Sequence, residues 1–241
     1  IDSSGRLLIG ATSAREISGH TPSLQLQGTQ HDTQTFSIIS NSADANPAYL
    51  FLSKQRSGAV GGSTIVQDGD RIGEIRFNGH DGNDFAHETA IIAAEVDGTP
   101  GTNDMPGRLI FATTADGAGA ITERMRITAA GNVGVGINSP VGKLAVSDGT
   151  VVAEINPFSA SSGAFIGTRS NHHVLFKTNA TERMRLDTSG RLLLGTTTSN
   201  AAAGSLHVKN AYIRLQAANQ TSSDFSQEVG VEWSQEEGSD V

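Results

Sequence analysis

The sequence has no cysteine, few aromatic residues and no long apolar run. Cysteine is absent from all 241 residues, which excludes disulfides, thiolate metal sites and cysteine nucleophiles. Aromatic residues make up 5% and apolar residues 37% of the chain. No apolar run approaches the roughly 18 residues that a membrane-spanning helix needs, so we expect no membrane insertion. With so few large side chains, burial is expected in a thin section or between chains.

Positive charge is also scarce. The chain carries 17 Lys and Arg against 25 Asp and Glu, a net charge of −8. Binding to phosphate backbones depends on Lys and Arg, so we expect no nucleic-acid partner. Glycine, in contrast, is abundant at 28 residues, well above its usual share of about 7%. This composition favours an elongated assembly over a compact globule.

The strongest signal in the sequence is an internal repeat. A ten-residue motif of the type Ile-Asp-Ser-Ser-Gly-Arg-Leu-Leu-Ile-Gly occurs three times, at residues 1–10, 127–136 and 186–195. The second and third copies each follow the pentapeptide TERMR, at 122–126 and 181–185. Each copy precedes a short alternating stretch, at 24–26, 144–146 and 206–208. Because the spacing between copies is unequal, we expect an inserted module after the first copy.

The local pattern of the repeat predicts a β-hairpin. Met125 and Ile127 alternate with Arg124 and Arg126, which is the period of two that separates the faces of a strand. The following turn has Asp at its first position and Gly at its fourth in two copies, at 2–5 and 187–190. These are the residues that such turns favour, because Asp can accept hydrogen bonds from the backbone that follows it.

The returning strand places Val133 and Val135 on one face. Gly134 and Gly136 then suggest close approach of another backbone. An isolated hairpin cannot bury its own apolar face. That face could pack on the next module, as in a solenoid, or on the same hairpin of other chains around a symmetry axis. The unequal spacing disfavours a solenoid. We therefore expect an intertwined core formed by Met125, Ile127, Val133, Val135, Met184, Leu186, Leu192 and Leu194.

These residues carry a family resemblance. The run TERMRI, its turn and the stretch NVGVGINSP at 132–140 resemble the shaft repeat of tail fibre and tailspike proteins of tailed bacteriophages. Residues 69–77 and 94–109 are similar to a module of the same fibres. The resemblance implies an all-β, elongated fold: repetitive β-hairpin modules that form an intertwined homotrimeric fibre with a β-prism-like or β-sandwich-like shaft.

The resemblance also implies partners, location and domain organisation. The partners would be other phage tail proteins and a bacterial surface glycan or protein receptor, and the location would be the tail fibre of the virion. The expected domains are a first shaft repeat, truncated at its N-terminus (1–53), an inserted β module (54–121), a second shaft repeat (122–180), and a third shaft repeat, truncated at its C-terminus (181–241).

An acidic region in the inserted module raises two alternatives. Residues 68–104 contain nine acids and two basic residues, and glycoside hydrolysis requires paired carboxylates. Acids in turns usually bind the local backbone, so we predict no catalytic residues, no cofactor and no enzyme. Oxygen ligands in Gly-containing turns suit calcium, which makes Asp81 and Asp84 the candidates for a structural calcium site, although their spacing matches no EF-hand loop.

Two classes of function therefore remain open. The first is a structural component of a tail fibre that supports host attachment. The second is a receptor-binding module of the fibre that binds glycan, with a glycan-depolymerising tailspike as a further possibility. Aromatic side chains that stack on sugars would favour the second class, but Tyr49, Tyr212 and Trp233 are scattered along the chain.

Overall fold

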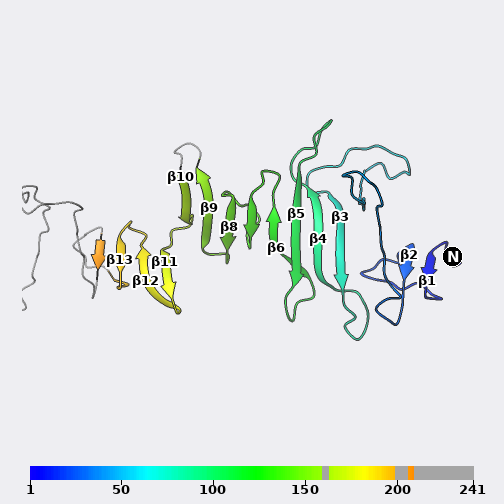
Figure 1. The fold of residues 1–241 in the computed structure, drawn as a ribbon, viewed down its shortest axis with the longest axis horizontal. Helices are drawn as coiled ribbons and strands as arrows, with labels where there is room; N and C mark the ends of the chain where they lie inside the picture. Colours follow the sequence, from blue (N-terminus) through cyan, green and yellow to red (C-terminus); the bar gives the residue numbers. More distant parts are fainter. Residues whose placement is uncertain (159–162, 199–205, 209–241) are drawn as a thin grey trace, which may run out of the picture. The chain divides into compact units, whose positions relative to one another are not determined.

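The computed structural model describes residues 1–158, 163–198 and 206–208. These residues form fourteen strands and no helix, which confirms the expected all-β fold (Figure 1). Accordingly, nothing in these ranges could cross a membrane as a helix. The chain divides into two compact units, residues 1–174 and 175–241. Most of the third repeat, from residue 209 onward, lies outside the described residues.

The first unit contains two sheets. A small parallel sheet pairs β1 (Leu7–Ile9) with β2 (Leu24–Leu26). An eight-stranded sheet follows, and its strands lie side by side in the order of the sequence (Figure 1). Its strands are β3 (Arg71–Asn78), β4 (Glu88–Val96), β5 (Gly107–Thr114), β6 (Ile121–Ile127), β7 (Val133–Val135), β8 (Leu144–Ser147), β9 (Val152–Phe158) and β10 (Gly163–Thr168).

The four-stranded sheet of the second unit begins at the unit boundary. Its order is again the order of the sequence. The strands are β11 (Val174–Thr178), β12 (Thr181–Leu186), β13 (Leu192–Leu194) and β14 (Leu206–Val208).

Each complete repeat consists of a hairpin and a third, parallel strand. β6 pairs antiparallel with β7, and β7 pairs parallel with β8. β12, β13 and β14 repeat this arrangement, and the first copy of the motif has the same parallel pair in β1 and β2. The sequence predicted the hairpin but not the parallel pairing. The connection from β7 to β8 is only residues 136–143, shorter than the dozen or so residues that parallel strands usually need.

The predicted hairpin turn forms in all three copies. The N–H of the fourth turn residue donates to the carbonyl of the first, from Gly5 to Asp2 and from Gly190 to Asp187, both at 3.0 Å. Thr128 takes the place of Asp in the second copy and accepts the bond from Gly131 at 2.9 Å. The Asp187 carboxylate accepts further hydrogen bonds from the backbone of Arg191 and Ser189, which lower its pKa. The turn chemistry expected from the sequence is therefore confirmed.

The predicted close approach at the glycines is also confirmed. A Cβ atom at Gly134 would lie 2.4 Å from the carbonyl oxygen of Ile137, in the β7–β8 connection. A Cβ atom at Gly136 would lie 2.2 Å from the carbonyl oxygen of Ser147, and Gly136 has φ = +69°. The equivalent Gly10 is just as crowded, with the carbonyl oxygen of Gln27 at 1.9 Å. The backbone that leaves the returning strand therefore has no room for a side chain in the first and second copies.

Candidate assembly interface

Facing residues form two apolar rows across one side of the eight-stranded sheet. Side chains of directly opposed residues lie on the same face, so the strand registers define the rows. The first row is Ile75, Ile92, Phe111, Met125, Val135 and Val146. The second row is Ala94, Leu109, Ile127, Val133, Leu144, Ile155 and Ile166. We call this side the apolar face, and neither row contains a charged residue.

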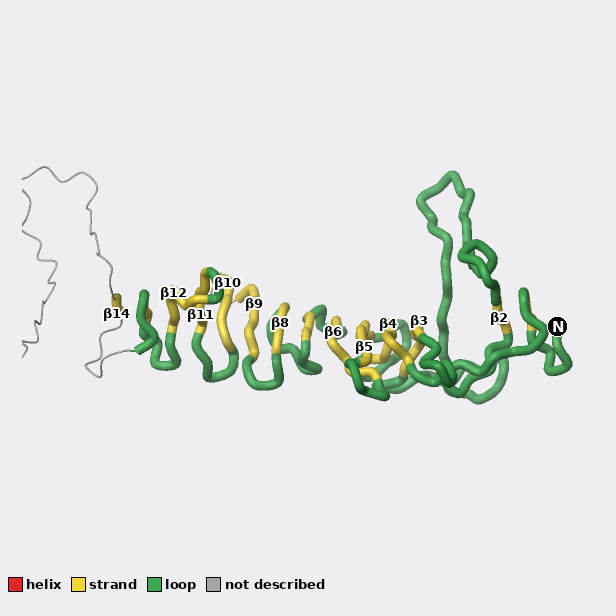
Figure 2. The backbone as a smooth tube through the Cα atoms, turned by 90° about the horizontal axis from the view of Figure 1, so that it is seen from below, coloured by secondary structure: helices red, strands yellow, loops and turns green. Residues whose placement is uncertain are grey.

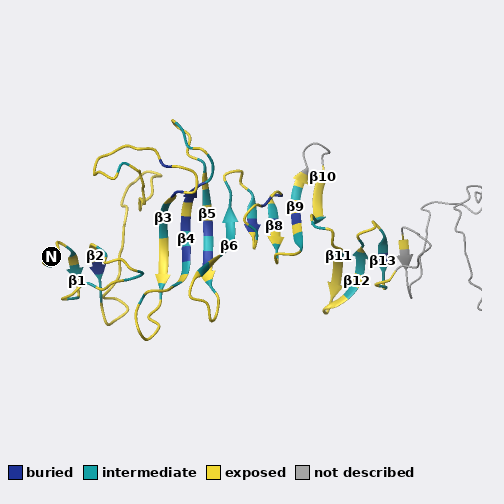
Figure 3. Ribbon diagram, turned by 180° about the vertical axis from the view of Figure 1, so that it is seen from behind, coloured by how far each residue is buried: buried dark blue, intermediate teal, exposed yellow. Residues whose placement is uncertain are grey.

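The apolar face is largely uncovered in the single chain, with Leu52 lying over its edge at Gly73. None of the thirteen row residues is buried; each is half-buried or exposed. Ile166 is 75% exposed, and Ile75 is 47% exposed. The central strands contain buried residues (Figure 3). By the strand registers these buried positions lie on the opposite side, with Val96 at the end of β4 as an exception. A large apolar surface of this kind on a protein marks an interaction site.

The sequence-predicted core residues lie on faces of this type. In the second repeat Met125 faces Val135 and Ile127 faces Val133. In the third repeat the same pairs recur as Met184 with Leu194 and Leu186 with Leu192. The first copy of the motif has the exposed Leu7, Ile9 and Leu24 in equivalent positions. The structure thus groups the residues within each repeat as expected, and their role in a trimer stays a prediction.

The opposite side of the eight-stranded sheet combines a small core with ion pairs. Ile91, Ala93, Ile110 and Ala112 form the buried cluster, and Ile121 packs against it. Charged residues of β3–β6 share this side with the cluster. A register shift between Phe111 and Ala112 leaves one extra residue on β6, which brings Glu123 to the same side as Arg126. Their side chains form an ion pair, and the third repeat has its counterpart in Glu182 and Arg185.

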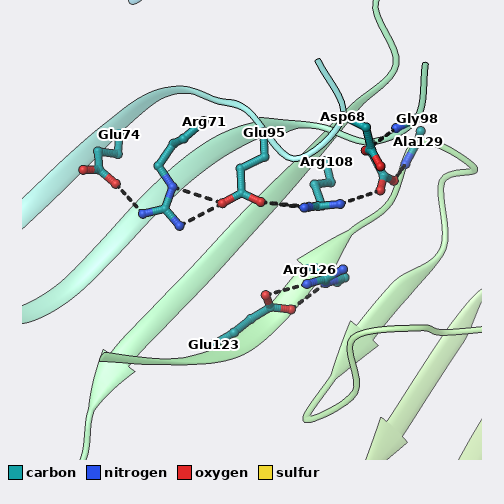
Figure 4. Close-up of polar contacts among 10 residues, drawn as sticks. Asp68, Arg71, Glu74, Glu95, Gly98, Arg108, Glu123, Arg126 and Ala129 are labelled. Atoms are coloured by element: carbon teal, nitrogen blue, oxygen red, sulfur yellow. Dashed lines mark hydrogen bonds and ion pairs between the residues drawn. The ribbon is translucent and has the colours of Figure 1, made fainter. Parts of the chain in front are cut away.

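Glu95 is the centre of the ion-pair network (Figure 4). Its carboxylate accepts hydrogen bonds from Arg71 at 2.8 Å and from Arg108 at 2.9 Å. Arg108 also donates to Asp97 at 2.9 Å, and the second oxygen of Asp97 accepts the N–H of Ala129 at 2.7 Å. The network therefore connects three neighbouring strands to the turn of the second repeat.

The network changes the titration of its acids. Burial raises the pKa of Glu95, but the hydrogen bonds from Arg71 and Arg108 outweigh burial, so the net shift of this pKa is downward. The backbone N–H of Ala129 is the largest cause that lowers the pKa of Asp97. The side-chain hydrogen bond from Arg56 is the largest cause that lowers the pKa of Asp70, which falls well below its usual range. Three acids of the region 68–104, namely Asp70, Glu95 and Asp97, are therefore held in ion pairs.

Replacing Glu95 by Gln should destabilise the folded protein by about 1–3 kcal/mol at pH 7, because two arginines lose a charged acceptor. A carboxylate with a lowered folded-state pKa stabilises the protein above its unfolded pKa, and this contribution is lost as the pH falls through the folded-state value. The difference in melting temperature between parent and Glu95→Gln should therefore narrow as the pH falls below about 4.5. The exposed Asp104→Asn serves as the control. A difference that stayed constant from pH 7 to pH 3 would contradict the prediction.

The calcium candidates Asp81 and Asp84 lie in a turn whose backbone N–H groups donate to their carboxylates. Asp81 accepts the N–H groups of Asn83 and Asp84 at 2.8 and 2.9 Å, which lowers its pKa. Asp84 accepts the N–H of Ala86 at 2.7 Å. Over residues 1–158, 163–198 and 206–208, no group of three or more His, Asp or Glu side chains is placed to hold a metal ion. Both carboxylates bind the local backbone, as turn acids do.

Sequence reasoning missed the buried positions behind the repeats. Leu193 is 1% exposed and Ala145 is fully buried, both on the side opposite the predicted core residues. Glu154 faces Ala145, is 3% exposed and forms an ion pair with Arg169 at 2.7 Å. Leu193 had a detectable signal, because the run of three leucines in β13 is apolar on both faces, as in strands that are covered on both sides.

Comparisons with known proteins find similarity among solved structures alone. No family model matches the chain. No curated protein matches it either. Two similar solved structures are tail fibre domains of a bacteriophage. The first is the carboxy-terminal domain of the bacteriophage T5 L-shaped tail fibre with its intramolecular chaperone domain; identity is 11%, the TM-score is 0.42, and the match covers 82% of this chain and 72% of that one.

The second structure is the carboxy-terminal domain of the same T5 fibre. Its identity to this chain is 11% and its TM-score is 0.39, with 77% of this chain and 100% of that chain covered. With TM-scores below 0.5, neither likeness assigns a function to this chain.

Proposed function

We propose that this chain is a structural segment of a bacteriophage tail fibre, which assembles as a homotrimer and supports host attachment. The observation that carries the proposal is the apolar face, whose two rows cross the eight-stranded sheet without a charged residue and without a buried residue. The tail fibre assignment comes from the TERMRI and NVGVG motifs in the repeats. The virion and its tail proteins are accordingly the proposed location and partners.

Three copies around an axis would cover this face with itself. A single-layer sheet with one apolar face exposed to water gains little from the hydrophobic effect, whereas burial contributes about 25 cal/mol for each Å² of apolar surface. Cyclic symmetry lets each copy bury the same face against its neighbours. The ion-paired side then faces water, where its charges are hydrated.

The oligomeric state is directly measurable. Light scattering on the purified chain should give a molar mass of about 75 kDa, three times the 25.1 kDa of one chain. A folded species of 25.1 kDa would contradict the homotrimer, and a stable dimer would contradict threefold symmetry.

The tail fibre assignment needs a test of location. Antibodies raised against the purified chain should label the fibres in electron micrographs of the phage that encodes it. Labelling of the capsid, or of no virion structure, would contradict the proposal. Competition of the purified segment with phage adsorption would then test its role in host attachment.

Receptor binding is the second candidate, because an open pocket with amide and hydroxyl groups in its lining could accept a glycan. This open pocket of about 640 Å³ lies between the start of β5 and the β7–β8 connection, and its lining includes Asn132, Asn138 and Ser139. Amides and hydroxyls can bind sugar hydroxyls. A glycan array should distinguish the two candidates: binding that is lost in Asn138→Ala would favour a receptor-binding module. Release of reducing sugar from host polysaccharide would instead indicate an enzyme.

A further inference from the structure

The long segment between β2 and β3 contains one stretch with the composition of a strand, although no strand forms there. Residues 27–70 contain no strand, and Figure 2 shows this part of the tube projecting away from the neighbouring strands. The stretch PAYLFLS at 47–53 is uncharged and rich in large apolar residues. Such composition is typical of a strand that is covered on both faces.

In the single chain the large side chains of this stretch are exposed, and its backbone has no hydrogen-bond partners from other backbone groups of the described residues. Phe51 is 79% exposed, Leu50 is 64% exposed and Tyr49 is 56% exposed. Within the described chain, residues 34–55 make no backbone-to-backbone hydrogen bond. Both the apolar side chains and the backbone groups therefore lack the partners that a folded strand has.

The stretch has two distinct sides. The rings of Tyr49 and Phe51 stack with their centroids 5.3 Å apart and their planes at 16°, so these alternate residues lie on one side. Leu52 belongs to the other side and lies over Gly73 of β3, where an added Cβ atom would be 2.5 Å from the Cβ of Leu52. Gly73 faces Ala94 of the apolar face, so Leu52 contacts the edge of that face.

Two ion pairs hold the end of the stretch in place. Lys54 and Arg56 both bind Asp70, which precedes β3, at 3.0 and 2.6 Å. Asp70 itself is 7% exposed and also accepts the N–H of Gln67. The Leu52 side is thus fixed on its own sheet, and the aromatic side is turned away from it.

We propose that the stretch 48–52 packs its aromatic side on the apolar face of a second copy of this chain. This inference rests on the homotrimer proposed above and specifies one of its contacts. The occupant and the surface match in chemistry, because neither the stretch 47–53 nor the two rows of the apolar face carry a charge. The stretch also ends at the edge of its own apolar face, where Leu52 lies over Gly73, so the contact continues the proposed interface.

A second copy fits better than the same chain. The Leu52 side already contacts the chain's own sheet, so Tyr49 and Phe51 face the space where a neighbour would lie. Under cyclic symmetry each copy donates one stretch and receives one, which leaves no copy unmatched. The charged Lys54 and Arg56 stay outside this contact on Asp70.

Photo-crosslinking tests this contact without assuming a register. A photoreactive phenylalanine analogue would replace Phe51, and the irradiated trimer would be separated on a denaturing gel. We expect covalent dimers and trimers, with mass spectrometry placing the cross-links in β3–β6. Val60, which is fully exposed in the same segment, carries the analogue in the control and should give no such product.

The outcomes separate this inference from the proposed function. A trimer whose Phe51 analogue cross-links only within its own chain overturns the exchanged stretch and leaves the homotrimer standing. A monomer by light scattering overturns both. As a second measurement, Phe51→Ser should lower the melting temperature of the trimer and Val60→Ser should not; equal melting of Phe51→Ser and parent also overturns the inference.

Discussion

Replacing Met125 by Asp is expected to leave the chain unassembled. Met125 lies in the middle of the first apolar row, between Phe111 and Val135. In the proposed trimer this change places three carboxylates in the interior, and an uncompensated buried charge costs about 3–5 kcal/mol for each copy. Light scattering at pH 7 should then show monomer or aggregate where the parent gives a trimer.

Arg124 supplies the matched control for this substitution. It is the exposed extra residue of the β6 bulge, and its guanidinium binds the hydroxyl of Thr113 at 3.0 Å. Arg124→Asp introduces the same carboxylate one position away and should still assemble. Arg126 would be a poor control, because its ion pair with Glu123 makes a charge reversal costly in itself. Equal assembly of Met125→Asp and Arg124→Asp would show that the apolar face is not the interface.

Replacing Gly136 by Val is expected to produce the second large loss of stability. Gly136 has φ = +69°, and a Cβ atom would lie 2.2 Å from the carbonyl oxygen of Ser147. The backbone strain alone costs about 1–3 kcal/mol, and the overpacking adds about 1–3 kcal/mol. The melting temperature should fall accordingly. The amide hydrogen of residue 136, which donates to the Arg124 carbonyl in the parent, should exchange faster with deuterium.

Substitution of Gly131 serves as a control that separates the cost of backbone strain from the cost of the steric clash. It belongs to the same repeat, and its φ of +71° is nearly the same. The nearest atom to its added Cβ is the Lys143 Nζ at 3.9 Å, which can move away. Gly131→Val should therefore show the strain without the clash. If both variants lost the same free energy of unfolding, the close approach of Ser147 would have no energetic importance.

The sequence predicted the local features of the repeat because they depend on neighbouring residues. Alternation placed Met125 and Ile127 on one face, and the Asp at the start of the turn predicted its hydrogen bonds. The parallel pairing of β8 was not predictable in this way, since it depends on a connection that folds back over Gly134. Ion pairs such as Glu95 with Arg108 were also missed, because they join residues on different strands.

The interface was only partly predictable for a related reason. The repeat motif predicted the apolar residues of the repeats but not Ile75, Ile92 or Phe111 of the inserted module. These residues join the same row only because the bulge in β6 keeps Met125 opposite Phe111. A shift of one residue in that pairing would have turned the face of the inserted module to the other side.

The order of the strands has a consequence for how the chain folds. In each sheet every strand pairs with the strand next to it in the sequence, so the contacts are local and the contact order is low for an all-β protein. Each strand can then pair with the preceding one as the sheet grows, and no long loop has to close first. A whole module could therefore be inserted or removed without changing the strand pairing within the remaining modules.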